Sequence, residues 1–162
     1  MPQPLAQQAL LSGNSWGTEV EIVKTGKVTA MRLILTAILF LFGLFNLMLG
    51  IGFILDPIGL GTTFNLAPIG TGGMAVLRAD MTAFFLVAGG CQLWGGWKRN
   101  GDLLLVPALL FGIACTGRAV SAALDGTYAG FAVPMLVEAL QVILAIAAWR
   151  VLPHHRISEI AN

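Results

Sequence analysis

Charged side chains are scarce in this sequence. Asp, Glu, Lys and Arg make up only 10% of its 162 residues, against roughly a quarter in a typical soluble domain. Hydrophobic residues account for 57% of the chain, which leaves too few polar side chains to cover a water-soluble domain of this size. The composition therefore excludes an independently soluble fold and predicts a one-domain membrane protein, with the lipid bilayer as its partner.

Net charge and cysteine content are also low. The formal net charge is +1, and the only cysteines are Cys91 and Cys115. A nucleic-acid-binding domain needs an excess of basic residues and a disulfide scaffold needs more cysteines, so we expect no nucleic-acid partner and no disulfide framework. The adjacent His154 and His155 lack further ligands. We therefore expect no metal site and no cofactor.

Four apolar segments are long enough to cross a bilayer as helices. A hydrocarbon core about 30 Å thick needs about 20 helical residues. The predicted helices cover residues 32–55, 75–97, 103–124 and 130–152. The first is longer than the apolar part of a cleaved signal peptide, so we interpret it as a permanent helix. The sequence predicts an all-α fold, an integral membrane four-helix antiparallel bundle over residues 31–153.

The remaining segments differ from the spans in composition. Residues 1–30 show no lasting hydrophobic period, and we interpret them as a flexible tail, with a short interfacial helix around residues 5–11 as the alternative. Residues 154–162 form a second, short tail. The connection from Asp56 to about Met74 is rich in Gly and Pro, which favours an irregular, partly ordered loop on the non-cytoplasmic face.

Basic residues predict the orientation of the bundle. Seven of the nine Lys and Arg residues fall on one side of the four predicted spans: Lys24, Lys27, Arg32, Lys98, Arg99, Arg150 and Arg156. Basic residues are enriched in cytoplasmic segments. An even number of spans also requires both termini to share a side. We therefore expect a multi-pass protein of the cell (inner) membrane with both termini, and both tails, in the cytoplasm.

A few charged and polar residues fall within the predicted spans. An ionisable group in the hydrocarbon costs about 2.5–3.5 kcal/mol on insertion scales, so it normally faces other helices and finds a partner. Arg118 and Glu138 lie on neighbouring predicted helices, each about 10 Å from the outer end of its helix. This similar depth predicts an ion pair. Helical spacing puts Ser121 and Asp125 on the face of Arg118. It likewise puts Gln141 on the face of Glu138.

Two further charges, Arg78 and Asp80, reach a similar depth on the second predicted helix. Together these residues form a candidate polar pocket in the outer half of the bundle, made of Arg78, Asp80, Arg118, Ser121, Asp125, Glu138 and Gln141. Three interpretations stay open: the residues only hold the helices together, they bind a lipid or quinone-like ligand, or Glu138 relays protons. No nucleophile, base and orienting group occur as a set, so no catalytic residue is assigned.

Three stretches carry a family resemblance: LRADMTAFFLVAGG at 77–90, GRAVSAALDG at 117–126 and LVEAL at 136–140. Over residues 32–152 the chain resembles the small four-helix bacterial membrane proteins of domain of unknown function 4345. The resemblance implies a four-helix bundle with family-type polar positions at Arg78, Arg118, Asp125, Gly126 and Glu138. At greater distance the plan is similar to the DoxX-like group, some of which are linked to quinone or sulfur redox chemistry, although this chain lacks a paired cysteine motif.

Two functional hypotheses follow. The first is a non-enzymatic accessory protein, or a bundle that binds a lipid or small ligand in its polar pocket. The second is a membrane enzyme or transporter component, quinone-linked or proton-coupled, that uses Glu138 with Arg118 tuning its charge. Small residues such as Gly89 and Gly90 are typical of close helix packing. That packing occurs within one bundle, in a homo-oligomer or against another membrane protein.

Overall fold

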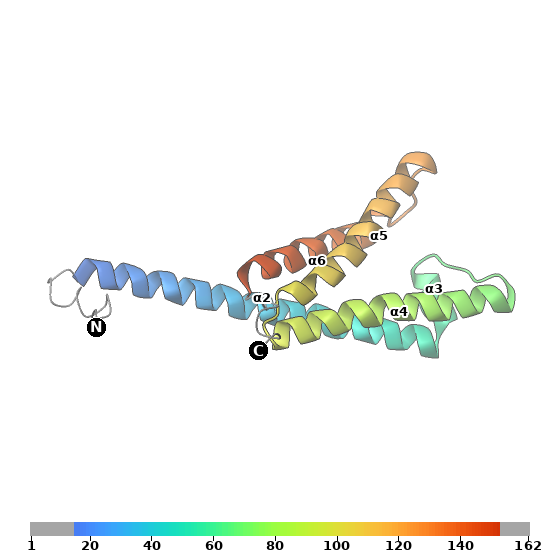
Figure 1. Cartoon of the computed structure of the whole chain (residues 1–162). Coiled ribbons are helices and arrows are strands. Elements are labelled where there is room, and N and C mark those ends of the chain that lie inside the picture. The colour runs from blue at the N-terminus through green and yellow to red at the C-terminus, as the bar shows by residue number, and fades with distance from the viewer. Residues whose placement is uncertain (1–14, 153–162) are drawn as a thin grey trace, which may run out of the picture. The chain divides into compact units, whose positions relative to one another are not determined.

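The described residues, 15–152 of the chain, form helices and no strands in this computed structural model. The elements are α2 (Ser15–Leu55), α3 (Pro57–Thr63), α4 (Gly70–Trp97), the 3-10 helix η1 (Asp102–Leu104), α5 (Leu105–Leu124) and α6 (Ala132–Val151) (Figure 1). The predicted all-α class is confirmed for this part of the chain. Contacts divide the chain into two units, Met1–Ile34 and Leu35–Asn162.

Four of the described helical segments are long and apolar enough to cross a membrane. They are Gly26–Leu55, Gly70–Trp97, Asp102–Leu124 and Ala132–Val151. Their large apolar side chains are widely exposed; Leu41, Leu109 and Ile143 are 68%, 65% and 63% exposed. An apolar surface of this extent marks an interaction site rather than a face turned to water. The lengths and composition are those predicted for membrane spans.

Residues 15–30 are helical, whereas the sequence predicts a flexible tail. They form the first part of α2, and the side chains of residues 26–34 are exposed. The prediction relied on finding an apolar face that repeats at helical spacing. A helix that is already nucleated extends through residues of ordinary helix propensity without such a face. No proline interrupts residues 15–30. The alternative helix at 5–11 and the tail at 154–162 lie outside the described residues.

The connection after Leu55 is more ordered than predicted. It contains α3, in which the Asp56 side chain caps the helix by accepting a hydrogen bond from the Gly59 N–H at 2.9 Å and Pro57 occupies the first turn. Both are typical of helix starts. α4 then begins at Gly70 rather than near residue 75. The glycine and proline content that predicts a loop is thus compatible with a short capped helix.

Two apolar clusters hold the second unit together. The first contains Leu39, Leu104, Ala148 and Leu152, which come from α2, η1 and the end of α6. The second is centred on Phe53, Leu77 and Phe85 of α2 and α4. The Phe53 and Phe85 rings stack with their centroids 5.8 Å apart, and Phe64 lies 5.5 and 5.7 Å from them. α2 therefore contributes to both clusters.

Glycine allows the close approach of α2 and α4. A Cβ atom at Gly89 would lie 2.7 Å from the Gly43 carbonyl oxygen, and one at Gly43 would lie 3.1 Å from the Gly89 carbonyl oxygen. A side chain at Gly89 would therefore force the two backbones apart. A Cβ at the neighbouring Gly90 would meet nothing within 4 Å. Of the neighbouring glycines Gly89 and Gly90, only Gly89 makes a close contact.

Candidate functional site

A cavity of about 610 Å³ lies among α2, α4, α5 and α6 in the second unit. We call it the central cavity. Its volume falls in the range of small-molecule sites, about 300–1,000 Å³. Its wall includes six aromatic residues, Phe45, Phe64, Phe84, Phe85, Phe111 and Tyr128. The wall is completed by residues 63–66, where α3 ends and the α3–α4 connection begins, and by residues 128–130 of the α5–α6 connection.

Three buried amide side chains meet next to this cavity, and we call them the amide triad. Asn46 of α2, Gln92 of α4 and Gln141 of α6 are all almost completely buried. Asn46 Nδ2 donates to Gln92 Oε1 and to Gln141 Oε1, each at 2.8 Å, and Gln92 Nε2 donates to Gln141 Oε1 at 3.0 Å. Burying an amide without hydrogen bonds is costly, so these bonds join the three helices. Asn46 and Gln141 line the cavity, whereas Gln92 does not.

The predicted ion pair between Arg118 and Glu138 is confirmed. Arg118 Nε donates to Glu138 Oε1 at 2.7 Å, and the two side chains are 29% and 11% exposed. Arg118 Nη1 also donates to Tyr128 Oη at 3.4 Å. Each residue of the pair lies six positions inside its helix from the α5–α6 connection, about 9 Å along the helix axis. The pair is therefore a polar group with no net charge set into an apolar wall.

Two buried acceptor atoms near the cavity have no hydrogen-bond partner among the described residues. They are Oδ1 of Asn46 and Oε2 of Glu138. The two residues are 0% and 8% exposed. A buried acceptor without a donor costs about 1–3 kcal/mol, which is why such atoms are rare in folded proteins. Both residues belong to the wall of the central cavity.

The structure brings together only part of the predicted polar pocket. Arg118, Glu138 and Gln141 line the central cavity. Ser121 and Asp125 are exposed and do not line it; Ser121 Oγ donates to Asp125 Oδ2 at 2.9 Å. Asp125 is also the C-cap residue of α5. These two residues share the helical spacing of Arg118 but lie outside the cavity wall, where they bind each other.

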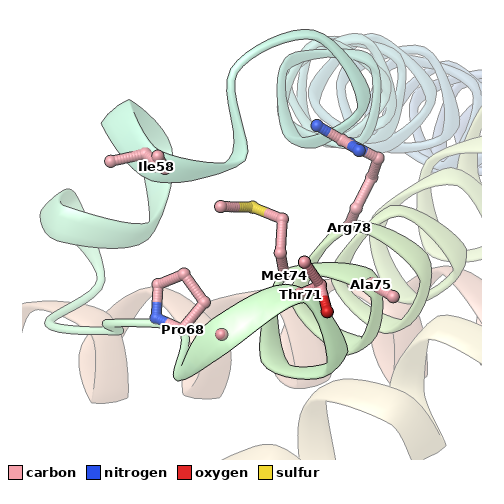
Figure 2. A pocket seen from close by; sticks show the side chains of 7 residues that line it. Ile58, Pro68, Thr71, Met74, Ala75 and Arg78 are labelled. Carbon is pink, nitrogen blue, oxygen red and sulfur yellow. The ribbon is translucent and has the colours of Figure 1, made fainter.

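Arg78 and Asp80 lie apart from the central cavity. Arg78 lines a second, wider hollow of about 740 Å³ with Met74 and other residues of α4, Ile58 of α3 and Pro68 of the α3–α4 connection. Figure 2 shows Met74 pointing across this hollow toward Ile58, with the Arg78 side chain to one side. Asp80 is exposed and lines neither space. Residues two positions apart point to different faces of a helix, so similar depth does not bring both into one site.

Sequence reasoning missed Asn46 and Gln92. Each is a lone amide inside an otherwise apolar run, and we included Gln141 only because it lies three positions after Glu138. The signal that could have found them is the cost of an unpaired amide at membrane depth, which requires a polar partner on another helix. Periodicity along one helix carries no information about such a partner.

The two cysteines and the described acidic residues form no further site. Cys91 and Cys115 are free thiols. The part of the chain that the structure describes contains no group of three or more His, Cys, Asp or Glu residues that could hold a metal ion. His154 and His155 lie outside it.

Comparison with known proteins adds no neighbour to this picture. No family model, no curated protein and no solved structure matches this chain. The functional argument therefore rests on the central cavity, the amide triad and the ion pair.

Proposed function

We propose that this chain is a multi-pass protein of the cell (inner) membrane with four antiparallel spans and both termini in the cytoplasm. The four long apolar helices support the spans, and the position of seven of the nine basic residues supports the orientation. In this orientation the α5–α6 connection is on the outer side. The central cavity then lies in the outer half of the bilayer.

Within this membrane protein, the central cavity holds a small amphipathic ligand, such as a lipid or quinone-like molecule, without catalysing a reaction on it. The observation that carries the proposal is the combination of an aromatic, ligand-sized cavity with buried, unsatisfied acceptors on residues of its wall. An apolar space with a few converging polar groups is the usual form of a ligand site. The one carboxylate in the wall is held by Arg118, which suits a binding role.

A cavity-filling variant tests this function. Ala114→Phe puts a ring into the wall of the central cavity, whereas Ala123→Phe puts the same ring on an exposed position of the same helix. Protein purified in mild detergent is extracted, and its retained small molecules are identified by mass spectrometry. We expect the wild-type protein and Ala123→Phe to retain one compound in stoichiometric amount and Ala114→Phe to lose it. Equal retention by Ala114→Phe would overturn the proposal.

Cysteine labelling tests the orientation. In a variant with Cys91 and Cys115 replaced by Ala, single cysteines are placed at Thr62 in α3 and at Asn100 between α4 and η1. A membrane-impermeant maleimide added to intact cells should label Thr62→Cys and not Asn100→Cys, and inverted vesicles should give the opposite result. Labelling of both positions from the cytoplasmic side contradicts the proposed topology.

One observation favours a second candidate, a proton-coupled enzyme or transporter component. Glu138 is a carboxylate in the cavity wall at the depth of the proposed spans, and its Oε2 is buried with no partner among the described residues. The test is proton entry into vesicles that carry a pH-sensitive dye. Entry that depends on the protein and is abolished by Glu138→Gln supports this candidate. Equal rates for the wild-type protein, the variant and protein-free vesicles contradict it.

A further inference from the structure

We infer that the ligand of the central cavity is an uncharged amphiphile whose head group donates hydrogen bonds, such as an alcohol or a phenol. The inference rests on the proposed function, because it assumes that a small ligand occupies this space. The head group is placed next to Asn46 and Glu138, whose unpartnered atoms are both acceptors. The inference concerns the chemistry of the ligand, which the cavity volume alone leaves open.

The buried wall atoms that lack a partner are both acceptors, which favours a ligand that donates. Asn46 Nδ2 donates two hydrogen bonds within the amide triad, which leaves Asn46 Oδ1 as the group to satisfy. Arg118 Nε donates to one oxygen of Glu138, which leaves the other oxygen. A ketone or ether would add lone pairs beside these acceptors, whereas an O–H group supplies the missing hydrogen.

The charges of the wall select an uncharged head group. Of the described residues that line the cavity, only Arg118 and Glu138 are charged, and they neutralise each other at 2.7 Å. An anionic or cationic head group would therefore bring a net charge into apolar surroundings, where an unpaired charge is costly. Phosphate, carboxylate and ammonium head groups are disfavoured for this reason.

The aromatic side chains suit an apolar body next to that head group. Phe84 lies 5.2 Å from Phe85 and 5.3 Å from Phe111 between ring centroids, with edge-to-face geometry in both pairs. All three rings line the cavity. Aromatic edges and faces exposed to one space can pack against a further ring or an alkyl chain. A phenol with an alkyl chain therefore matches the wall in three ways: it donates a hydrogen bond, it is uncharged and it has an apolar body.

The test compares matched probes on the detergent-solubilised full chain. 4-Octylphenol carries the donor, 4-octylanisole replaces the O–H by a methyl ether, and 4-octylbenzoate carries a negative charge. Binding is measured by equilibrium dialysis. The amount of probe taken up by detergent is measured with Ala114→Phe and subtracted. We expect 4-octylphenol to bind about 10-fold more tightly than either other probe, because only it satisfies an acceptor without adding charge.

Variants within the amide triad show which residue causes the preference for the phenol over the ether. Asn46→Leu and Gln92→Leu each remove two hydrogen bonds of the triad, but only Asn46 lines the cavity. Asn46→Leu should reduce the preference for the phenol over the ether to about 3-fold or less, and Gln92→Leu should leave it near its wild-type value.

The outcomes separate the inference from the proposed function. Equal binding of the phenol and the ether to the wild-type protein overturns the donor requirement and leaves the cavity as a ligand site. Binding of 4-octylbenzoate as tightly as the phenol overturns the requirement for an uncharged head group. If no probe shows binding that Ala114→Phe removes, while the extracted wild-type protein still retains a compound of its own, the inference fails and the proposed function stands.

Discussion

The α2–α4 interface and the α5–α6 interface are held together by different contacts. Between α2 and α4, Gly43 and Gly89 let the two backbones meet. Between α5 and α6, a Cβ at Gly112 would only touch Val142 at 3.9 Å, and the short contact is the Arg118–Glu138 ion pair. Backbone contact through glycine leaves no space between helices, whereas long polar side chains can bridge helices beside a cavity. The glycine contact of the first interface is steric, whereas the ion pair of the second is electrostatic.

The largest effect should come from breaking the ion pair of the α5–α6 interface. Arg118→Met leaves Glu138 buried without its cation, and we expect a loss of about 3 kcal/mol in the free energy of unfolding. The measurement is reversible unfolding in mixed micelles with increasing dodecyl sulfate. The double variant with Glu138→Gln should regain most of the loss because no charge is left unpaired. An unchanged unfolding curve for Arg118→Met would show that this interface does not depend on charge.

A smaller effect should follow from breaking the glycine contact of the α2–α4 interface. Gly89→Ala puts a methyl group against the Gly43 carbonyl oxygen, and we expect a loss of about 1–3 kcal/mol from overpacking. The matched control is Gly90→Ala, where the methyl group meets nothing within 4 Å, and its change should stay within about 0.5 kcal/mol. Similar unfolding curves for the two variants would refute a role for close backbone contact.

A hydrogen-bonded contact of α2, α4 and α6 can be tested through Gln92, the polar side chain that α4 contributes to the amide triad. Gln92→Leu removes two hydrogen bonds, and we expect a loss of about 1–2 kcal/mol in the free energy of unfolding. Thr82→Val, which removes the weaker bond from Thr82 Oγ1 to the Gly50 carbonyl oxygen at 3.3 Å, should cost about 0.6 kcal/mol. If Thr82→Val is the more damaging of the two, the triad is not what joins α2, α4 and α6.

The smallest effect is expected at Ser121, outside both interfaces. Its hydroxyl binds Asp125, but both residues are exposed. Ser121→Ala should therefore change the free energy of unfolding by less than about 0.5 kcal/mol. A loss as large as that of Arg118→Met would mean that the polar face of α5 acts as one unit, as the sequence alone predicted.

Predictions from sequence succeeded where depth along the helices was sufficient information. The depth of Arg118 and Glu138 follows from their positions along two apolar helices, so their pairing could be predicted. Arg78 and Asp80 were assigned to the same pocket by depth alone, but depth does not determine which face of a helix a residue occupies. The start of α2 at Ser15 was missed because helix propagation needs no buried face.

The all-α class, the four long apolar helices and the pairing of two opposite charges could be predicted from the sequence, because hydropathy and helical rise are local properties of the chain. The contact of Asn46 with Gln92 and Gln141, which are 46 and 95 residues away in the sequence, is visible only in the folded chain. The fold also places two residues with unsatisfied acceptor atoms in the wall of an aromatic cavity. Those features arise where surfaces of separate helices meet, and the match between such surfaces depends on three-dimensional packing that no single segment encodes.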